Sequence, residues 1–326
     1  MTRKLCPQGH GSFSDSADLC ISCGAPLIVD QGARVIAQRF RLDRIIGLGG
    51  TRSTVWEGLD LRTTRQVAVK LLPEPTGVEL TRFMRGAYIF AELDHPNIAR
   101  VYEYGEYGDA GQGGGLYLVM ERLEGATLDR VLRKGPLTYA RALSLAEQLL
   151  DALGAIHDLR AVHRDIKPGN LFVTPDEIDG RWRVRLFDFD LATRYEDLTT
   201  TELYGDVLRA PESASICGTP EYMAPEQILG QPVDGRADLY AAGMTLYRML
   251  AGRPAFGGPE RRDVYRAQLR DPLPPLPAIP GRPPLPHGLD AVLAQATAKR
   301  PVDRFVRARD FRMALRGLGA RVLARA

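Results

Sequence analysis

The chain contains few lysines, few cysteines and no long apolar run. Only five of its 43 basic residues are lysine, so positive charge is carried mainly by arginine. No segment approaches the roughly 20 apolar residues that a membrane-spanning helix needs, and the N-terminal sequence MTRKLCPQGH lacks an apolar signal region. We therefore expect a cytoplasmic protein without a membrane span. The formal net charge of +3 is nearly balanced, which gives no reason to expect nucleic acid as a partner.

Three of the four cysteines lie within the first 23 residues, which is not the pattern of a disulfide framework. Together with one histidine they form two short pairs, Cys-x3-His and Cys-x2-Cys. Three thiolates and one imidazole make a closed tetrahedral set for structural zinc, and so short a segment cannot fold on its own core without metal. The four predicted zinc ligands are Cys6, His10, Cys20 and Cys23.

Residues 1–30 thus resemble a short zinc ribbon, which we expect to dock on the rest of the chain or on a protein partner. Reduced thiols in an unfolded tail are the alternative. The fourth cysteine, Cys217, is distant in sequence and is predicted to be a packing residue.

The first half of the chain has the alternating pattern of β-strands. Three such runs lie between residues 35 and 70, separated by the turn signals GLGG and DLRTTR. Two more follow at residues 99–106 and 116–123, and residues 79–93 have a helical pattern. This half is predicted to be a small lobe of antiparallel strands.

The second half is mostly helical. In residues 139–159 and 237–252 the apolar residues recur three and four positions apart, as in core-facing helices. Residues 272–286 are rich in proline and predict an extended loop, after which the helical pattern returns from Leu289. The predicted fold class is therefore α+β, with a β-rich lobe followed by a larger helical lobe.

Two features of the β-rich half are suited to phosphate. Gly47 and Gly49 lie between strand-like runs, where glycine lets backbone N–H groups approach phosphate oxygens; a plain hairpin turn is the alternative. Lys70 ends the apolar strand VAVK. A lysine on a buried strand is costly unless an anion meets it, although at an edge strand it could reach water instead.

The run HRDIKPGN, residues 163–170, places acidic, basic and amide side chains within eight residues after an apolar helix. Asn170, together with Asp188 after the strand-like RVRLF, offers oxygen ligands to a hard cation such as Mg²⁺. Asp165 can then orient a hydroxyl and accept its proton, and Lys167 can offset charge on a transferring phosphoryl group. A polar loop with helix caps would explain the Asp and the Asn but not the whole set.

These motifs, in this order, resemble the protein serine/threonine kinase family, in particular its bacterial eukaryotic-like branch. The resemblance covers residues 36–318, and the lysine two positions after Asp165 is typical of the serine/threonine group. The matching segments are the Gly-rich loop, VAVK, HPNI at 95–98, YLVME at 117–121, HRDIKPGN, the Asp-Phe pair at 188, GTPEYMAPE at 218–226, ADLYAAG at 237–243 and DRF at 303–305.

The resemblance implies the bilobal protein-kinase fold over residues 36–320, preceded by the zinc ribbon. Its antiparallel N-lobe is expected at about 36–121 and its helical C-lobe at about 125–320. It also implies ATP with Mg²⁺ or Mn²⁺ as cofactors and protein substrates that are phosphorylated on serine or threonine. A small-molecule phosphotransferase is disfavoured, because GTPEYMAPE resembles the peptide-substrate platform of protein kinases.

The same resemblance implies roles for individual residues. Lys70 holds the α- and β-phosphates, Asp165 is the catalytic base beside Lys167, and Asn170 and Asp188 bind Mg²⁺. The other implied nucleotide contacts come from the Gly-rich loop, two strands and the hinge: Gly47, Gly49, Val55, Ala68, Met120, Glu121 and Leu123. The implied scaffold residues are Thr219, which resembles the threonine that contacts the catalytic Asp and Lys, the ion pair Glu226 with Arg304 and the loop anchor Asp238.

One departure from the family pattern affects phosphate binding. Gly86 stands at the helix position that usually carries the acidic partner of Lys70, and neither Glu79 nor Glu92 is an obvious substitute. The chain is therefore expected to be an active or conditionally active kinase, and the alternative is a nucleotide-binding pseudokinase that acts as a scaffold.

Two further departures concern loops. Asp190 replaces the glycine of the usual Asp-Phe-Gly motif, where tolerance of a left-handed backbone is expected to matter, and Arg52 stands where a third glycine is common. The long segment between Asp188 and Glu226 is rich in hydroxyls, and we expect phosphorylation to order it, with Arg164 receiving the phosphate. An unmodified polar loop is the alternative. The candidate hydroxyls are Thr199, Thr200, Thr201, Ser213 and Ser215.

Overall fold

The computed structural model divides the chain into two compact units. Unit 1 comprises residues 1–91 and 100–123, and unit 2 comprises residues 92–99 and 124–326. The structure describes residues 3–5, 12–13, 17–21, 28–30, 34–49, 52–108, 114–175, 182–197, 219–279 and 285–323. Within these ranges no helix has the length and apolar character that crossing a membrane requires.

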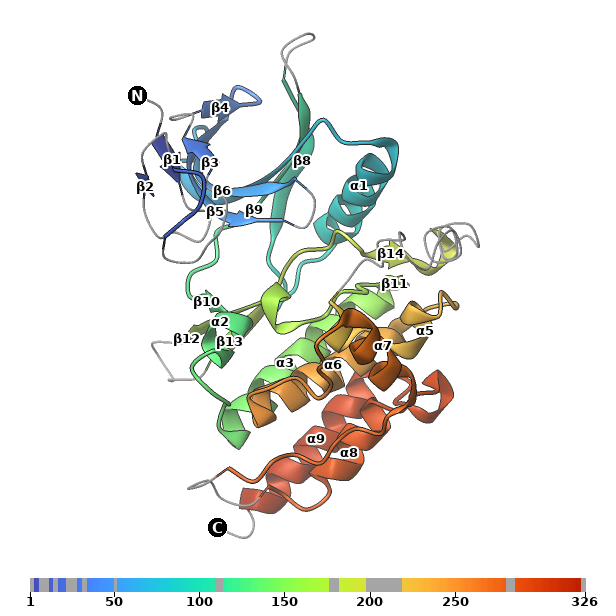
Figure 1. The fold of residues 1–326 in the computed structure, drawn as a ribbon. Coiled ribbons are helices and arrows are strands. Elements are labelled where there is room, and N and C mark those ends of the chain that lie inside the picture. Colours follow the sequence, from blue (N-terminus) through green and yellow to red (C-terminus); the bar gives the residue numbers. More distant parts are fainter. Residues whose placement is uncertain are drawn as a thin grey trace. The chain divides into compact units, whose positions relative to one another are not determined.

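The described part of unit 1 consists of antiparallel strands and helix α1 (Figure 1). Its N-terminal part is a three-stranded sheet of order β2-β1-β3. A six-stranded sheet of order β4-β5-β6-β7-β9-β8 follows, and helix α1 packs against β8 and β9. The bounds are β1 Arg3–Leu5, β2 Ser12–Phe13, β3 Ile28–Asp30, β4 Arg34–Ile36, β5 Phe40–Leu48, β6 Thr54–Asp60, β7 Arg65–Pro73, α1 Gly77–Ala91, β8 Val101–Tyr107 and β9 Gly115–Glu121.

One face of the six-stranded sheet forms the apolar core of unit 1. Trp56, Val69 and Val119 are paired across β6, β7 and β9, and all three are buried in this core. Because side chains alternate along a strand, the residues next to them in sequence project from the opposite face. That second face carries the residues predicted to contact the nucleotide.

Unit 2 is mainly helical, with short strands around the HRDIKPGN segment (Figure 1). Helix α3 packs against α6 and α9, and α8 packs against the same two helices. The bounds are β10 Ala126–Thr127, α2 Leu128–Leu132, α3 Tyr139–Asp158, β11 Ala161–Val162, η1 Pro168–Asn170, β12 Leu171–Pro175, β13 Trp182–Leu186, β14 Thr193–Arg194, η2 Tyr195–Asp197, η3 Pro220–Tyr222, α5 Pro225–Ile228, α6 Gly235–Ala251, α7 Arg261–Arg270, α8 Leu289–Ala296, η4 Pro301–Asp303 and α9 Ala308–Leu323.

Helix α6 is buried on nearly all sides and forms the centre of unit 2. Asp234 caps its first turn by accepting a hydrogen bond from the backbone N–H of Arg236 at 2.9 Å. Gly252 ends it in a left-handed conformation with φ 74°, and its N–H donates to the carbonyl of Arg248. The predicted end of this helix at Gly252 is therefore confirmed, as is the predicted helix at 139–159.

Helix α1 begins two residues before the predicted start at Glu79. The reason is a local cap, because the Glu79 carboxylate accepts hydrogen bonds from the backbone N–H and the hydroxyl of Thr76, both at 2.8 Å. A glutamate that reaches back to the residue before the helix satisfies donors that would otherwise be exposed at its N-terminus.

Candidate active site

The nucleotide-contacting residues predicted in unit 1 share one face of its sheet. Gly47 is paired with Val55, Val55 with Lys70, and Ala68 with Met120. Directly paired residues of antiparallel strands project from the same side, and so do residues two apart on one strand. Lys70 is 5% exposed although it is charged, and Ala68 and Met120 are also buried. The strand register therefore brings these five residues together on the face opposite the core.

The Gly-rich loop connects β5 to β6 at one end of this face. Gly49 donates its N–H to the carbonyl of Ser53 at 2.8 Å, and a Cβ atom on Gly49 would overlap the buried Ser53 hydroxyl. Arg52 adopts φ 44°, a left-handed conformation that explains why glycine is common at this position. Its guanidinium lies 3.8 Å from the carboxylate of Glu79 and also donates to the carbonyl of Glu74.

The predicted hinge leaves the sheet at the end of β9. Glu121 donates its N–H to the carbonyl of Arg100 at 2.7 Å, and its carboxylate accepts from the N–H of Arg100 at 3.2 Å. The next side chain, Arg122, pairs with Glu57 and donates to the carbonyl of Leu123. The hinge backbone is thus fixed by contacts within unit 1.

Helix α1 does not supply the acidic group that the family pattern has at Gly86. Gly86 is buried and has no side chain to offer. The Glu79 carboxylate is committed to the cap at Thr76, and Glu92 pairs with Arg194 at 2.6 Å. Both glutamates considered as substitutes therefore have other partners.

In unit 2 the segment before Asp165, the predicted catalytic base, is held by Asp238. This carboxylate is 1% exposed and accepts hydrogen bonds from the backbone N–H groups of His163 and Arg164, both at 2.9 Å. The His157 ring nitrogen Nε2 is its third partner at 3.0 Å. The anchor predicted at Asp238 is present, and it immobilises the chain directly before Asp165.

Lys167 and Asn170 both donate hydrogen bonds to one carboxylate oxygen of Asp165. Lys167 Nζ donates to Asp165 Oδ2 at 2.7 Å, and Asn170 Nδ2 donates to the same oxygen and to the Asp165 carbonyl, both at 2.9 Å. The N–H of Phe187 donates to the carbonyl of Asn170 at 3.1 Å, in line with the β12–β13 register. Asp188 follows Phe187 in sequence, so this hairpin brings the chain of the second predicted metal ligand beside the first.

The Asp-Phe-Asp motif corrects one expectation. The left-handed residue is Asp188, with φ 67°, whereas Asp190 is not among the described residues with positive φ. The left-handed backbone is therefore adopted by Asp188, the predicted metal ligand, and not by Asp190, which replaces the glycine. Phe189 is buried and its ring packs edge-on against His163, with centroids 4.7 Å apart.

His163 is fully buried, and this burial lowers its pKa below the usual value. Its Nδ1 lies 3.3 Å from the N–H of Asp165, which can only donate. The ring is therefore neutral with Nδ1 as an acceptor, and it fixes the backbone of Asp165, the predicted catalytic base.

The oxygen donors of unit 2 fit a hard divalent cation. The carbonyl and the carboxylate of Asp165 can only accept from Asn170, so the amide nitrogen faces them and the amide oxygen is the atom that Asn170 can offer to a metal. An amide oxygen with a nearby aspartate carboxylate is the donor chemistry that Mg²⁺ prefers.

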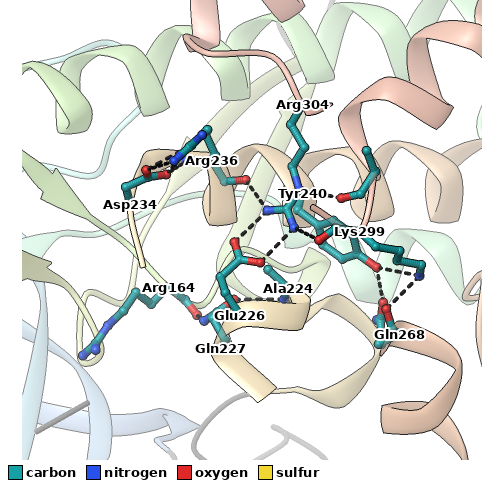
Figure 2. A network of polar contacts seen from close by, with 11 residues as sticks. Arg164, Ala224, Glu226, Gln227, Asp234, Arg236, Tyr240, Gln268, Lys299 and Arg304 are labelled. Carbon is teal, nitrogen blue, oxygen red and sulfur yellow. Dashed lines mark hydrogen bonds and ion pairs between the residues drawn. The ribbon is translucent and has the colours of Figure 1, made fainter. Parts of the chain in front are cut away.

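A buried ion pair between Arg304 and Glu226 joins two distant segments of unit 2 (Figure 2). Arg304 makes two parallel bonds to the Glu226 carboxylate at 2.7 and 2.8 Å, with both side chains at most 3% exposed. Its remaining N–H groups donate to the carbonyls of Ala298, Arg236 and Lys299. All five guanidinium donors are used, and the predicted scaffold pair is confirmed.

Two glutamines of unit 2 make contacts that motif reasoning missed. Gln227 follows the buried Glu226 and bonds to the backbone of Arg164, and Gln268 bonds to the backbone of Pro220. Lys299 donates to the carbonyl of Gln268. This lysine could have been singled out from the sequence, because it is one of only five lysines in an arginine-rich chain.

Several predicted residues lie outside the described part of the chain. They are the zinc ligands Cys6, His10 and Cys23, the predicted packing residue Cys217 and the hydroxyls Thr199, Thr200, Thr201, Ser213 and Ser215. Of the zinc set only Cys20 is described, and it is buried. In the described residues no group of three or more His, Cys, Asp or Glu could hold a metal. Arg164, the predicted phosphate receiver, donates through Nε to the carbonyl of Leu191 at 2.7 Å.

Comparison with known proteins identifies the family. The protein kinase domain model matches residues 40–302, and the chain belongs to this family. It is 35% identical to the serine/threonine-protein kinase PknA of Mycobacterium tuberculosis over 276 residues, which are 83% of this chain and 59% of that protein.

Two further relatives have similar identity. The serine/threonine-protein kinase PknB of M. tuberculosis is 35% identical over 282 residues, 85% of this chain and 42% of the relative. The probable serine/threonine-protein kinase PknB of Bifidobacterium longum is 34% identical over 283 residues, 84% and 39% respectively. The chain thus spans between 39% and 59% of the length of these relatives.

Proposed function

We propose that the chain is a protein serine/threonine kinase that transfers the γ-phosphate of ATP to serine or threonine hydroxyls of proteins. The observation that carries the proposal is the arrangement of Lys167 and Asn170 around the Asp165 carboxylate, on a loop held by Asp238. The carboxylate is oriented by two donors, and its acceptor capacity suits a substrate hydroxyl. The similarity to serine/threonine-protein kinases supports the same activity.

Each proposed role follows from a side chain's chemistry. Asp165 orients the hydroxyl of the substrate and accepts its proton, while Lys167 offsets negative charge on the transferring group. Lys70, a buried cation on the nucleotide face of unit 1, holds the α- and β-phosphates. Asn170 and Asp188 would hold Mg²⁺, which neutralises charge on the phosphate oxygens when bound.

The test is transfer of labelled γ-phosphate from ATP to myelin basic protein, with nucleotide affinity measured separately by calorimetry. Asp165→Asn keeps the size of the side chain but removes the proton acceptor, so the rate should fall by about 10²- to 10⁴-fold. Its affinity for ATP should stay within a few-fold of the wild type. Asp158→Asn is the matched control, because Asp158 is exposed at the end of α3 and should not affect transfer.

A nucleotide-binding pseudokinase is the second candidate, and Gly86 favours it. Because Gly86 has no side chain, the carboxylate that usually orients the strand lysine is missing from this helix position. A wild-type chain that binds ATP but transfers no phosphate at any Mg²⁺ or Mn²⁺ concentration would replace the kinase proposal with this one.

We further propose that the segment between Asp188 and Glu226, which we call the activation segment, is phosphorylated on one or more of its hydroxyl residues, with Arg164 as the receiving cation. Mass spectrometry after incubation with ATP should find phosphate between residues 198 and 218. An active sample that is unmodified there would contradict this regulation.

For the N-terminal module we propose a structural zinc ribbon that provides a surface for a protein partner. The described strands support it: Leu5 of β1 is paired with both Ser12 of β2 and Ile28 of β3, and Cys6 follows Leu5 in sequence. Metal analysis should find one zinc per chain. The zinc should be lost in Cys23→Ser and retained in Cys217→Ser, and a wild type without zinc contradicts the proposal.

A further inference from the structure

The end of the activation segment is held by two glutamine side chains. We call residues 219–224 the platform segment; it contains η3, Pro220–Tyr222. Gln268 of α7 donates through Nε2 to the carbonyl of Pro220 at 3.0 Å. Gln227 of α5 accepts through Oε1 from the N–H of Ala224, also at 3.0 Å. The two amides therefore grip the segment near its two ends.

The orientation of Gln268 is determined by its partners. Gln268 is fully buried, and the Pro220 carbonyl can only accept, so the amide nitrogen must face it. The amide oxygen then accepts from the hydroxyl of Tyr240, which is also fully buried (Figure 2). A buried amide with both ends bonded is costly to displace, because movement would leave polar atoms without partners.

Lys299 joins the same contacts from another part of the chain. Its Nζ donates to the carbonyl of Gln268 at 2.7 Å (Figure 2). It also donates to the carbonyl of Ala267 at 3.3 Å. It also lies over the Phe256 ring, 4.6 Å from the centroid. Burial lowers the pKa of Lys299 to about 8, so it is still protonated and able to donate at neutral pH.

Gln227 connects the platform segment to the HRDIKPGN segment at residues 163–170, which we call the catalytic loop. While its Oε1 accepts from Ala224, its Nε2 donates to the carbonyl of Arg164 at 2.9 Å (Figure 2). Arg164 directly precedes Asp165 in sequence. One amide group thus sets the distance between the backbone of the platform segment and the backbone beside the catalytic carboxylate.

We propose that Gln268 and Gln227 are positioning residues for the protein substrate, with Lys299 and Tyr240 holding Gln268 in place. This inference rests on the proposed kinase function and deepens it. The acceptor hydroxyl must lie within hydrogen-bond reach of Asp165, and the platform segment, which resembles the peptide-binding surface of kinases, presents it. We call the side chains of Gln227 and Gln268 the clamp. Their described polar contacts are with the platform segment, the carbonyl of Arg164 and the hydroxyl of Tyr240, and not with the proposed Mg²⁺ ligands Asn170 and Asp188, so we expect the clamp to affect binding of the peptide and not of ATP.

The test measures steady-state kinetics of Gln268→Met and Gln227→Met with a synthetic peptide copying residues 195–208 and with myelin basic protein. Loss of a buried hydrogen bond should raise the KM for the peptide by about 5- to 30-fold, while the KM for ATP stays within about twofold. A variant that merely folds less well lowers kcat and leaves both KM values unchanged. Gln231→Met, at an exposed position, is the matched control.

Gln227→Glu separates the two bonds of this side chain, because a carboxylate keeps the acceptor for Ala224 and loses the donor to Arg164. If the link to the catalytic loop matters, this variant should raise the KM for the peptide as Gln227→Met does. Unchanged peptide KM in Gln268→Met and both Gln227 variants of an active enzyme would overturn the inference and leave the kinase function intact.

Hydrogen exchange tests the clamp by a measurement that does not depend on catalysis. The Ala224 amide should exchange at least about tenfold faster in Gln227→Met than in the wild type, because its acceptor is gone. If the wild type transfers no phosphate, the kinase function fails, and this measurement alone decides whether the clamp exists. Equal exchange in both proteins would refute it.

Discussion

Replacing Arg304 by methionine should destabilise unit 2 more than any other change considered for this chain. Arg304 and Glu226 have side chains that are 0% and 3% exposed, so the variant leaves a carboxylate buried without its cation. Three carbonyls, of Ala298, Arg236 and Lys299, lose their donor at the same time. Methionine keeps much of the apolar volume, so the loss is mainly electrostatic.

The magnitude follows from these contacts. Removing one partner of a buried ion pair costs about 3–5 kcal/mol, and a buried carbonyl that loses its partner adds about 1 kcal/mol. We expect a loss of at least about 4 kcal/mol, a large part of the 5–15 kcal/mol that is typical of a folded protein. The double variant Arg304→Met with Glu226→Gln should recover about 1–2 kcal/mol, because it no longer buries an unpaired charge.

Urea unfolding followed by tryptophan fluorescence measures this loss. The chain has two tryptophans, Trp56 in unit 1 and Trp182 in unit 2, so a Trp56→Phe background reports unit 2 alone. Arg309→Met is the control, because its pair with Asp310 is exposed, and it should cost less than about 0.5 kcal/mol. The reasoning fails if Arg304→Met unfolds like this control, or if adding Glu226→Gln gives no recovery.

Three further predictions concern stability in the same assay. A Cβ atom on Gly235 would lie 2.8 Å from the His157 ring, so Gly235→Ala should destabilise unit 2 by about 1–3 kcal/mol. Gly154 in α3 has open space around it, so Gly154→Ala should stabilise the helix by about 0.5–1 kcal/mol. Equal effects of the two variants would contradict the packing argument. Asp60 accepts two bonds from Arg39, which hold its pKa well below the usual range, so Asp60→Asn should destabilise unit 1, measured by Trp56 in a Trp182→Phe background. Such a carboxylate stabilises above its unfolded pKa, so the difference from wild type should shrink below about pH 4, and a constant difference would refute the assignment. Burial lowers the pKa of Lys299 to about 8, so between about pH 8 and pH 10 the unfolded chain binds one more proton than the folded chain. The free energy of unfolding of the wild type should therefore rise with pH in this range, relative to that of Lys299→Met. A difference between the two proteins that stays flat or falls would show that burial does not govern the pKa of this lysine.

Much of the architecture could be read from local patterns. The strands of unit 1 and the helices α3 and α6 follow from periodicity, because alternation and three-to-four spacing reflect which face is buried. The end of α6 at Gly252 follows from the left-handed conformation that glycine adopts cheaply. The group formed by Asp165, Lys167 and Asn170 could also be recognised from the sequence, because all three residues lie within eight positions of one short segment.

Other features could be known only from the folded chain. That Asp188, and not Asp190, is left-handed depends on how the β12–β13 hairpin delivers the chain. The clamp joins Gln268 to Pro220, 48 positions apart, and Gln227 to Arg164, 63 positions apart, and no local pattern encodes such pairs. The sequence by itself determined the family, the strands, the helices and the chemical groups of the site. Tertiary structure decided which polar groups meet, because a hydrogen bond requires two atoms within about 3 Å, and the packing of unit 2 sets those separations.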